Sequence, residues 1–318
     1  MPVRRLLGQL WRGAGLRHLP IAVLESSPPS VRFEMHGEPG GPRDVTDHHV
    51  PVSLRPLILG LRIDQPGGAA DMPPSGRSLV VRDAATGERL AAISLTVAGT
   101  LPLMSGSLSL FRPTSCRTVA VPARVRWWRY ALAAVHARRA SSRGDRLCMS
   151  ASDLRCLNVY YMFARRVFLI GVALGERTNL FPMDLVGSVG SGEYLLALRA
   201  TSPAIDLMEG SRTIAMSAAP AGHLSAVYAL GAHHRLASVD VTALPFAVSR
   251  SPLHGLPVLA SGFTRELTVV ATHRIGSHVL FVCRVDREQG STERQIAHVS
   301  QMYAEWLAKR GRSVEALA

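Results

Sequence analysis

The stretch that decides the fold is residues 167–218, VFLIGVALGERTNLFPMDLVGSVGSGEYLLALRATSPAIDLMEGSRTIAMSA. Apolar runs alternate in it with short polar segments bounded by glycine and proline. We interpret it as a strand, a polar turn, a loop that contains Asn179 and Pro182, a second strand, a short helix and a third strand. Such a succession predicts a mainly β fold in which one short helix interrupts the strands.

The most specific element of this stretch is the short helix. Ser202 is a preferred N-cap residue, Pro203 suits the first helical position, and Gly210 stands where glycine often ends a helix. A helix of about seven residues has little stability of its own, but its N-terminus presents unpaired N–H groups. Arg199 precedes that end, and the hydroxyls of Thr201 and Ser202 flank it. The turn therefore predicts an anion site suited to a phosphate; the alternative is an ordinary capped helix beside a solvated arginine.

The order of four segments, NLFPMDLVG, LLALRATSPAIDLME, TIAMSA and GSHVLFVCRV, resembles the flavin reductases of the FMN-binding split-barrel class. The resemblance covers about residues 157–310 and leaves the first half of the chain outside. It implies a split β-barrel, FMN as cofactor with FAD as the alternative, and NAD(P)H as co-substrate. It also implies a homodimer with the site at the subunit interface.

The resemblance further implies roles for particular residues. In the family, one loop lines the flavin ring, a strand-to-helix turn takes the FMN phosphate, and a late Gly-Asp-His segment opens a closing strand. That last segment is here Gly276-Ser277-His278, so His278 becomes the candidate catalytic side chain; the alternative is a structural histidine in a β-hairpin. The implied ring contacts are Asn179, Phe181, Pro182, Met183, Asp184 and Leu185, and the implied phosphate contacts are Arg199, Ala200, Thr201 and Ser202.

Two details complete this set of candidates. Family members often carry a hydroxyl where this chain has Met183-Asp184, and an acid is unfavourable beside an anionic reduced flavin. His233, His234 and His273 are weaker candidates for a role at the site. Hydride transfer to a flavin needs no acid from the protein if the geometry is right, so the lack of a clear acid–base pair does not argue against this chemistry.

Composition indicates a packed protein with a localised positive charge. The chain has 318 residues, of which 47% are hydrophobic and 19% charged, and its formal net charge is +13. Residues 167–318 hold 13 Lys/Arg against 12 Asp/Glu, whereas residues 1–166 hold 23 Arg against 11 acids. The excess charge therefore lies outside the flavin-like half and is no evidence for a flavin site. Arginine in place of lysine throughout is typical of a GC-rich genome.

The cysteines and apolar runs bear on where the protein works. The four cysteines show no CxxC and no metal-ligand spacing, so we expect reduced, partly buried thiols and no bound metal. Apolar runs such as 167–174 are far too short to span a bilayer. The basic N-terminus lacks the apolar core and cleavage site of a signal peptide. We therefore expect a soluble, cytoplasmic protein.

The first half carries no motif that names a function. Short β-like runs predict a small, mainly β domain over residues 1–121, including a hairpin whose turn spans Asp83–Glu88, with Gly87 able to take a positive φ. Asp47-His48-His49 fits a polar turn before a strand better than a metal site, because no third ligand follows at useful spacing. Residues 157–318 form the flavin reductase-like domain in this division.

Residues 122–156 form the third predicted region, an Arg-rich helix followed by a linker. Pro122 suits a first helical turn, and apolar residues then recur at helical spacing. An Arg-rich helix can bind nucleic acid, an acidic membrane or an acidic partner; the alternative is a helix between domains whose arginines are solvated or paired. We favour the second interpretation and expect Trp127 and Trp128 to pack between the domains.

The predicted fold class is thus mainly β with a few helices: a C-terminal FMN-binding split β-barrel preceded by a small mainly β domain and a bridging helix. The predicted activity is NAD(P)H-dependent reduction of flavin, with the reduced flavin supplied to a partner oxygenase. One alternative is an FMN-dependent oxidase of a small metabolite on the same fold. Another is a non-enzymatic flavin- or nucleic-acid-binding protein.

Overall fold

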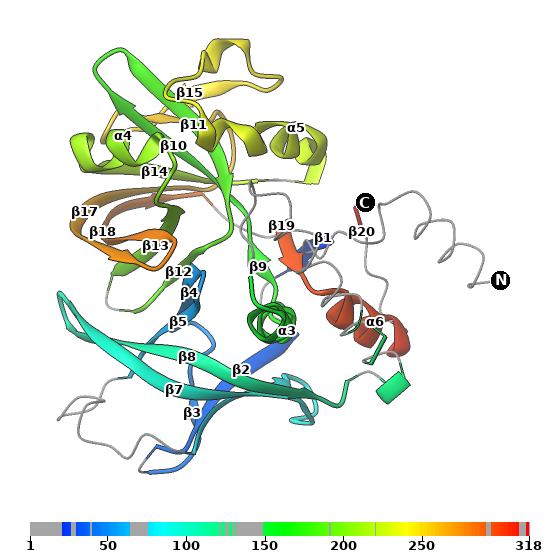
Figure 1. The fold of residues 1–318 in the computed structure, drawn as a ribbon. Helices are drawn as coiled ribbons and strands as arrows, with labels where there is room; N and C mark the ends of the chain where they lie inside the picture. Colours follow the sequence, from blue (N-terminus) through cyan, green and yellow to red (C-terminus); the bar gives the residue numbers. More distant parts are fainter. Residues whose placement is uncertain are drawn as a thin grey trace.

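The computed structural model describes residues 21–26, 30–38, 40–63, 76–120, 122–124, 127–128, 131, 149–190, 192–219, 221–290, 294–311 and 316–317. The basic N-terminal segment, the linker at 141–145 and Cys148 lie outside these residues. Strands dominate the described chain, and a few short helices flank the sheets (Figure 1). None of the described helices is long and apolar enough to cross a membrane.

Seven antiparallel strands of the first half form one sheet, in the order β3-β2-β6-β7-β8-β5-β4. They are β2 (Val31–His36), β3 (Arg43–Asp44), β4 (His49–Leu54), β5 (Leu57–Arg62), β6 (Arg77–Asp83), β7 (Arg89–Leu103) and β8 (Gly106–Thr118). Side chains of β2 alternate between buried and half-buried, as a strand with one face on a core requires. The predicted hairpin is confirmed: β6 and β7 flank a turn in which Gly87 has φ +72°. The predicted polar turn is also confirmed, because Asp47 and His48 precede β4.

A second sheet of seven antiparallel strands forms the split barrel, in the order β11-β10-β14-β17-β18-β13-β12. Its strands are β10 (Phe168–Leu174), β11 (Arg177–Met183), β12 (Val186–Ser188), β13 (Glu193–Arg199), β14 (Thr213–Ala218), β17 (Thr264–Ile275) and β18 (His278–Gln289). One core holds the inner faces of these strands together with helix α4 (Ala204–Ser211). Val279, Phe281 and Cys283 lie in that core and Val285 packs against it, as alternate residues of a strand with one inward face do.

The predicted loop around Asn179 and Pro182 is wrong. Residues 177–183 form strand β11, which pairs with β10 along its full length from Leu174↔Arg177 to Phe168↔Met183. β11 is the edge strand of its sheet, and an edge strand tolerates a proline because one side of it needs no ladder hydrogen bonds. The proline and asparagine suggested a loop, but they occupy such an edge.

A third, smaller sheet lies between the two halves in the order β20-β1-β19-β9. Its strands are β1 (Ile21–Ser26), β9 (Arg165–Arg166), β19 (Arg294–Val299) and β20 (Ala316–Leu317). Two capped helices adjoin it: the Ser150 hydroxyl accepts a backbone N–H at the start of α3 (Ala151–Tyr160), and Ser300 does the same for α6 (Gln301–Lys309). The remaining elements are α5 (Leu224–Ala229), the 3₁₀ turns η3 (Ala221–His223), η4 (Leu230–Arg235) and η5 (Val241–Ala243), and the strand pair β15 (Val248–Arg250) and β16 (Pro257–Leu259).

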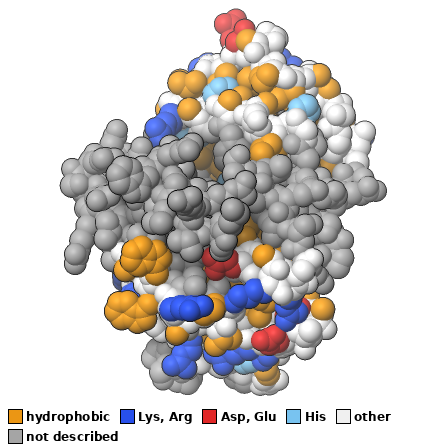
Figure 2. Space-filling view, turned by 90° about the vertical axis from the view of Figure 1, so that its right-hand side faces the viewer, with side chains coloured by type: hydrophobic (Ala, Val, Ile, Leu, Met, Phe, Trp, Pro, Cys, Tyr) orange, Lys and Arg blue, Asp and Glu red, His pale blue; other side chains and the backbone are white. Residues whose placement is uncertain are grey.

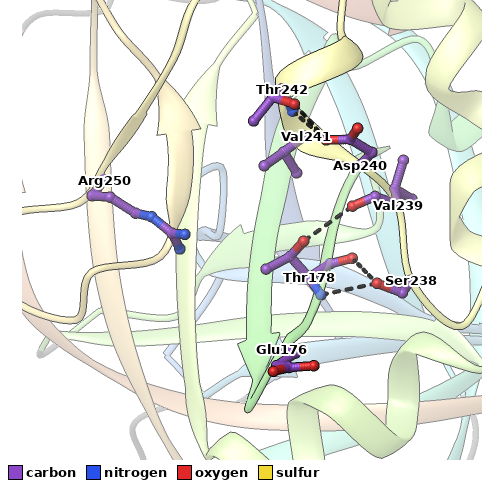
Figure 3. Close-up of a pocket in the computed structure, with 8 residues that line it drawn as sticks. All are labelled: Glu176, Thr178, Ser238, Val239, Asp240, Val241, Thr242 and Arg250. Atoms are coloured by element: carbon purple, nitrogen blue, oxygen red, sulfur yellow. Dashed lines mark hydrogen bonds between the residues drawn. The ribbon is translucent and has the colours of Figure 1, made fainter.

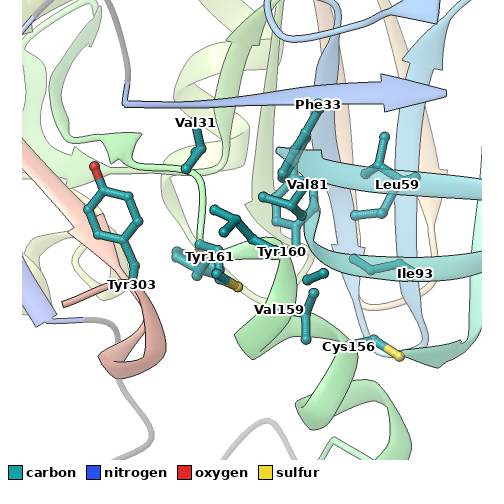
Figure 4. Packing of buried hydrophobic residues seen from close by; sticks show 14 of the residues in the cluster. Val31, Phe33, Leu59, Val81, Ile93, Cys156, Val159, Tyr160, Tyr161 and Tyr303 are labelled. Carbon is teal, nitrogen blue, oxygen red and sulfur yellow. The ribbon is translucent and has the colours of Figure 1, made fainter. Parts of the chain in front are cut away.

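The largest core joins distant parts of the sequence. Helix α3 packs against β7 and β8 of the first-half sheet and α6 packs against α3, and Tyr160 and Tyr303 are buried in the core that these elements share (Figure 4). Trp306 is buried in the same core. Leu307 of α6 belongs to this core as well. The division into residues 1–121, 122–156 and 157–318 stays a prediction, and the core shows that α6, from the last of these regions, packs with the first.

A separate apolar cluster joins the first half to the barrel. Val50 and Val52 of β4 pack with Leu195 of β13 and Leu280 of β18. The turn after β4 also reaches the barrel hairpin, since the Ser277 N–H donates to the Arg55 carbonyl oxygen at 2.9 Å. At the hairpin turn, Gly276 has φ +54°, and a Cβ there would lie 2.6 Å from that carbonyl oxygen. The first half therefore covers one face of the barrel sheet, and the turn after β4 lies beside His278.

Candidate functional site

The turn between β13 and α4 holds the predicted phosphate contacts. β13 ends at Arg199, and α4 begins at Ala204 after an N-cap at Pro203. The N-cap is thus one residue later than predicted, although the Ser202 hydroxyl still accepts the Ala204 N–H at 3.3 Å. The Ile205 N–H donates to the Ser202 carbonyl oxygen. Two backbone N–H groups at the start of the helix are therefore already paired. Binding of an anion here would depend on charged side chains more than the sequence suggests.

The other end of α4 also differs from the prediction. The left-handed cap is Arg212, with φ +53°, and Gly210 lies inside the last turn. A Cβ at Gly210 would lie 2.5 Å from Cδ2 of Leu174 on β10. A side chain at this position would require the Leu174 side chain to move, and the glycine does not end the helix.

Two arginines and a histidine gather at the start of α4, and we call Arg199, His234 and Arg235 the cationic site. Ser202 brings the two segments together, because its hydroxyl donates to the His234 carbonyl oxygen. Partial burial, and then the charge of Arg235, lower the pKa of Arg199. The pKa of His234 is lowered by burial and, to a smaller extent, by both arginines, although a hydrogen bond to the Gly231 carbonyl opposes this. Among the described residues, no carboxylate forms an ion pair with Arg199 or Arg235. The site therefore concentrates positive charge that an anion would neutralise.

His278 lies next to this site and is buried, with 1% of its surface exposed. It pairs with Arg199 across strands β18 and β13. Its Nδ1 accepts the Leu54 N–H at 3.4 Å and lies 2.9 Å from the Ser277 hydroxyl. Burial, and then the charge of Arg199, lower its pKa to about 4. At neutral pH the ring is uncharged, and because Nδ1 accepts hydrogen bonds its proton is on Nε2.

The residues implied as ring contacts lie elsewhere and are used within the chain. Both hydrogens of the Asn179 amide are donated, to the carbonyl oxygens of His233 at 3.0 Å and Leu236 at 2.9 Å. Phe181 and Met183 are buried in the barrel core, and Leu185 lies in the cluster that joins the two halves. Pro182 is half-buried on the edge strand. These side chains pack or hydrogen-bond within the chain, and their assignment as ring contacts stays a prediction.

Asp184 is held by the first half and its neighbours. Its Oδ2 accepts the Tyr161 hydroxyl at 2.8 Å and lies 2.7 Å from Nδ1 of His298. Although burial raises the pKa of Asp184, the histidine and the tyrosine hydrogen bond outweigh it and leave the pKa below its usual value. Arg165 donates to the Asp184 carbonyl oxygen and to the Tyr160 hydroxyl. The carboxylate is therefore neutralised by an internal network and is not presented to a ligand as a free acid.

The 3₁₀ turn η4 connects the predicted ring contacts to the predicted phosphate contacts. From the sequence, its histidines were only weaker candidates for the site. The Val239 N–H donates to the Thr178 carbonyl oxygen at 2.7 Å, and the Thr178 hydroxyl donates to the Val239 carbonyl oxygen at 3.0 Å. Together with the two Asn179 bonds, these contacts hold residues 233–239 against the free edge of β11. His234 and Arg235 are carried to the start of α4 as a result. The tripeptide His233-His234-Arg235 was the signal available in the sequence.

A surface hollow of about 420 Å³ lies near this edge, between β11, the segment around η5 and β15 (Figure 3). Glu176 and Asp240 contribute carboxylates to its wall, and Arg250 lies across from Thr178 and Val241. Two carboxylates against one guanidinium make it a poor site for a phosphate. The cationic site remains the better candidate for an anion.

The prediction for the two tryptophans is wrong. Trp127 is 75% exposed and Trp128 is 56% exposed, so neither packs between domains. Arg124 in the same helical segment is exposed as well. Figure 2, which views the side that carries α6, shows hydrophobic side chains beside a row of Lys and Arg side chains in its lower part. Two tryptophans and one arginine of the described part of this segment are therefore exposed.

No family model matches the chain, and no curated protein matches it. Solved structures that resemble part of the chain include flavin reductases and FMN-binding proteins. The FMN-binding protein from Thermus thermophilus is 23% identical, with a TM-score of 0.37 over 40% of this chain and 73% of that one. The NADH:FAD oxidoreductase SgcE6 from Streptomyces globisporus is 18% identical, with a TM-score of 0.42 over 46% of this chain and 88% of that one. BorF, the flavin reductase component of a bacterial two-component tryptophan halogenase, is 16% identical, with a TM-score of 0.40 over 46% and 93%.

Proposed function

We propose that this protein binds a phosphorylated flavin and reduces it with a nicotinamide nucleotide. The observation that carries the proposal is the cationic site, where two arginines converge on the start of α4 and no described carboxylate pairs with either. A flavin phosphate is a dianion at neutral pH and would neutralise that charge. Charge-assisted hydrogen bonds from arginine to phosphate are short and strong, and the planar guanidinium can form two at once.

The structure fits the phosphate end of a flavin better than it fits the ring contacts implied by the sequence. Arg199 and Arg235 would hold the phosphate, with the hydroxyl of the exposed Thr201 beside them. His278 is the best-placed candidate at the ring end, because its neutral ring carries a proton on Nε2 that can be donated. Asn179, Phe181 and Met183 would support the site from behind, by holding η4 and filling the barrel core.

A bound flavin would supply the two-electron chemistry, accepting hydride from the nicotinamide. The protein's part would be to bind and orient. Leu54 and Ser277 hold the His278 ring through contacts with its Nδ1, which leaves Nε2 as the nitrogen that can donate a hydrogen bond. Since this histidine stays uncharged at neutral pH, it can stabilise negative charge by donating a hydrogen bond but does not add a full positive charge.

The partner protein and the oligomeric state are also part of this proposal. Supply of reduced flavin to an oxygenase is the use we favour, since BorF is the reductase component of a two-component halogenase. A homodimer stays a prediction from the resemblance. In this chain the first half already covers one face of the barrel sheet, so any second copy would contact a different face.

The test is a spectrum of the purified full-length protein with and without FMN or FAD, followed by addition of NADH. We expect flavin fluorescence to be quenched on binding and NADH to be oxidised only when flavin is present. Arg199→Ala should weaken flavin binding, whereas Arg177→Ala, at an exposed position on β11, serves as the matched control. A protein that neither binds flavin nor oxidises NADH would contradict the proposal.

The exposed indoles favour a second candidate function, binding of single-stranded nucleic acid. Aromatic side chains stack on bases, and nearby arginines contact phosphates. Gel-shift titrations of Trp127→Ala and of a variant lacking residues 122–146 would test it. Binding that falls steeply with salt and is lost in both variants would support this function, and binding unaffected by either change would exclude this surface.

A further inference from the structure

We propose that Cys116 and Cys156 are a redox-active thiol pair that peroxide converts into an intramolecular disulfide. The two residues are forty positions apart in the sequence, on strand β8 and on helix α3. Neither forms a disulfide in the structure. Nothing in the proposed flavin chemistry uses them.

The packing of α3 on the first-half sheet brings the two thiols together. Cys156 is buried in the core shared by these elements, and Cys116 packs against the same core. The two side chains are hydrogen-bonded to each other. In Figure 4 the sulfur of Cys156 points from α3 toward the strands of that sheet.

A second contact gives independent support for this register. Thr118 is two residues after Cys116, so both side chains leave β8 on the same face. The Thr118 hydroxyl lies 4.0 Å from the sulfur of Met162, just beyond the end of α3. The face of β8 that carries Cys116 and Thr118 therefore meets the α3 segment, in agreement with the contact between Cys116 and Cys156.

The two thiols differ in a way that assigns their roles. Cys116 is partly exposed and Cys156 is buried. The hydrogen bond with Cys116 and burial both raise the pKa of the Cys156 thiol, so it stays protonated. Cys116 is thus the thiol that an oxidant reaches first, because reaction requires access and the thiolate form.

The reaction balances with hydrogen peroxide as the oxidant. The Cys116 thiolate attacks one peroxide oxygen, the O–O bond breaks, and hydroxide leaves; after proton transfer the products are a sulfenic acid and water. The Cys156 sulfur then attacks the sulfenic sulfur, the S–O bond breaks, and a second water forms with the Cys156 proton. Two thiols are oxidised by two electrons, and one peroxide is reduced to two waters.

The consequence is a covalent tie between β8 and α3. In the sequence this tie brackets the Arg-rich segment 122–146, since one cysteine precedes it and the other follows it. Its formation depends only on the packing of α3 on the sheet and is independent of flavin binding.

The test is mass spectrometry of the full-length protein after treatment with hydrogen peroxide and alkylation of the remaining thiols. We expect the chain to lose the mass of two hydrogen atoms and to regain it with dithiothreitol. Trypsin should release residues 90–117 cross-linked to residues 156–165, which carry Cys116 and Cys156 respectively. The cross-link should vanish in Cys116→Ala and in Cys156→Ala; the first replaces a partly exposed residue, so it keeps the test valid if the second folds poorly.

Two control variants separate this pair from other thiols. Cys148→Ala should leave the cross-link intact, as should Cys283→Ala, whose cysteine is buried in the barrel core. A cross-link that runs instead through the 147–155 peptide, which carries Cys148, would overturn the proposal. Oxidation of Cys116 to sulfenic or sulfinic acid in the wild-type protein without any cross-link would also overturn it.

Discussion

The turn Arg199–Ser202 and the segment Asn179–Leu185 were both predicted to contact flavin, and the structure treats them differently. At the turn, charge is left uncompensated among the described residues and gathers with His234 and Arg235. In the second segment, the Asn179 amide hydrogens and Asp184 Oδ2 have hydrogen-bond partners inside the chain and the apolar side chains are packed, whereas the Asn179 amide oxygen is buried without a partner. A charged side chain that has no ion-pair partner within the chain can pair with a ligand. A side chain that is already hydrogen-bonded or packed mainly supports the fold.

The largest expected effect tests whether the second segment is scaffold. Phe181→Ala removes a fully buried ring from the barrel core, and such changes lower the free energy of unfolding by about 3–5 kcal/mol. Urea denaturation would measure it. The matched change at the turn, Thr201→Ala, alters an exposed residue and should change stability by less than about 0.5 kcal/mol. Equal losses in the free energy of unfolding for Phe181→Ala and Thr201→Ala would contradict the difference between the two regions.

The next effect concerns His278, which is buried and lies opposite Arg199 on the neighbouring strand. Its pKa falls from 6.5 to about 4 on folding. Between these values the unfolded chain binds a proton that the folded chain does not, so this contribution to stability is complete above pH 6.5 and is lost as the pH falls toward 4. The loss amounts to about 3 kcal/mol.

His278→Gln removes this titration, so its unfolding free energy should vary less between pH 6.5 and pH 4 than that of the wild-type protein. Urea titrations at several pH values would measure the difference. His223→Gln, on the connecting segment, is the control and should keep the wild-type slope. Parallel pH profiles for the wild-type protein and His278→Gln would contradict a lowered pKa of His278 in the folded protein.

A smaller effect tests the link between the two groups. Asn179→Ala removes two hydrogen bonds that hold η4 against β11, and we expect a loss of about 2 kcal/mol in stability. FMN affinity should fall several-fold as well, because Arg235 is carried by η4. Asn158→Ala, which removes one side-chain bond to the Leu154 carbonyl oxygen on α3, should leave FMN affinity unchanged. A full loss of flavin binding in Asn179→Ala with unchanged stability would instead place Asn179 at the ring.

The smallest effect concerns Arg235, which is exposed. Replacing it with alanine should weaken FMN binding about fivefold at low salt, which is the range of an exposed ion pair. The difference from the wild-type protein should shrink as ionic strength rises, because salt screens exposed charges. Fluorescence titrations at two salt concentrations would measure both quantities, and an effect that does not depend on salt would argue against a charge contact.

The sequence was sufficient for those features whose signal is local. The β6–β7 hairpin followed from alternating runs around Gly87, and the β17–β18 hairpin from runs around Gly276. The helix after β13 followed from Ser202 and Pro203, with an error of one residue at its start. The resemblance gave the split barrel. In each case the residues that determine the element lie within a few positions of each other.

The remainder depends on contacts between distant segments. Pro182 suggested a loop because a sequence does not show which strand will be at the edge of a sheet. The support that Asn179 gives to η4 could not be predicted, because its partners His233 and Leu236 are more than fifty residues away. The position of Arg235 beside Arg199 was missed for the same reason, since only the contacts of residues 233–239 with β11 bring it there.

The most direct test of the phosphate site compares FMN with riboflavin, which lacks the phosphate, in the wild-type protein and in Arg199→Ala. Fluorescence quenching gives the four dissociation constants. The wild-type protein should bind FMN more tightly than riboflavin, and Arg199→Ala should lose about 10- to 100-fold in FMN affinity, as expected for a hydrogen bond to a charged group, while riboflavin binding stays the same. Equal losses for FMN and riboflavin, or no preference for FMN in the wild-type protein, would contradict a phosphate site at Arg199.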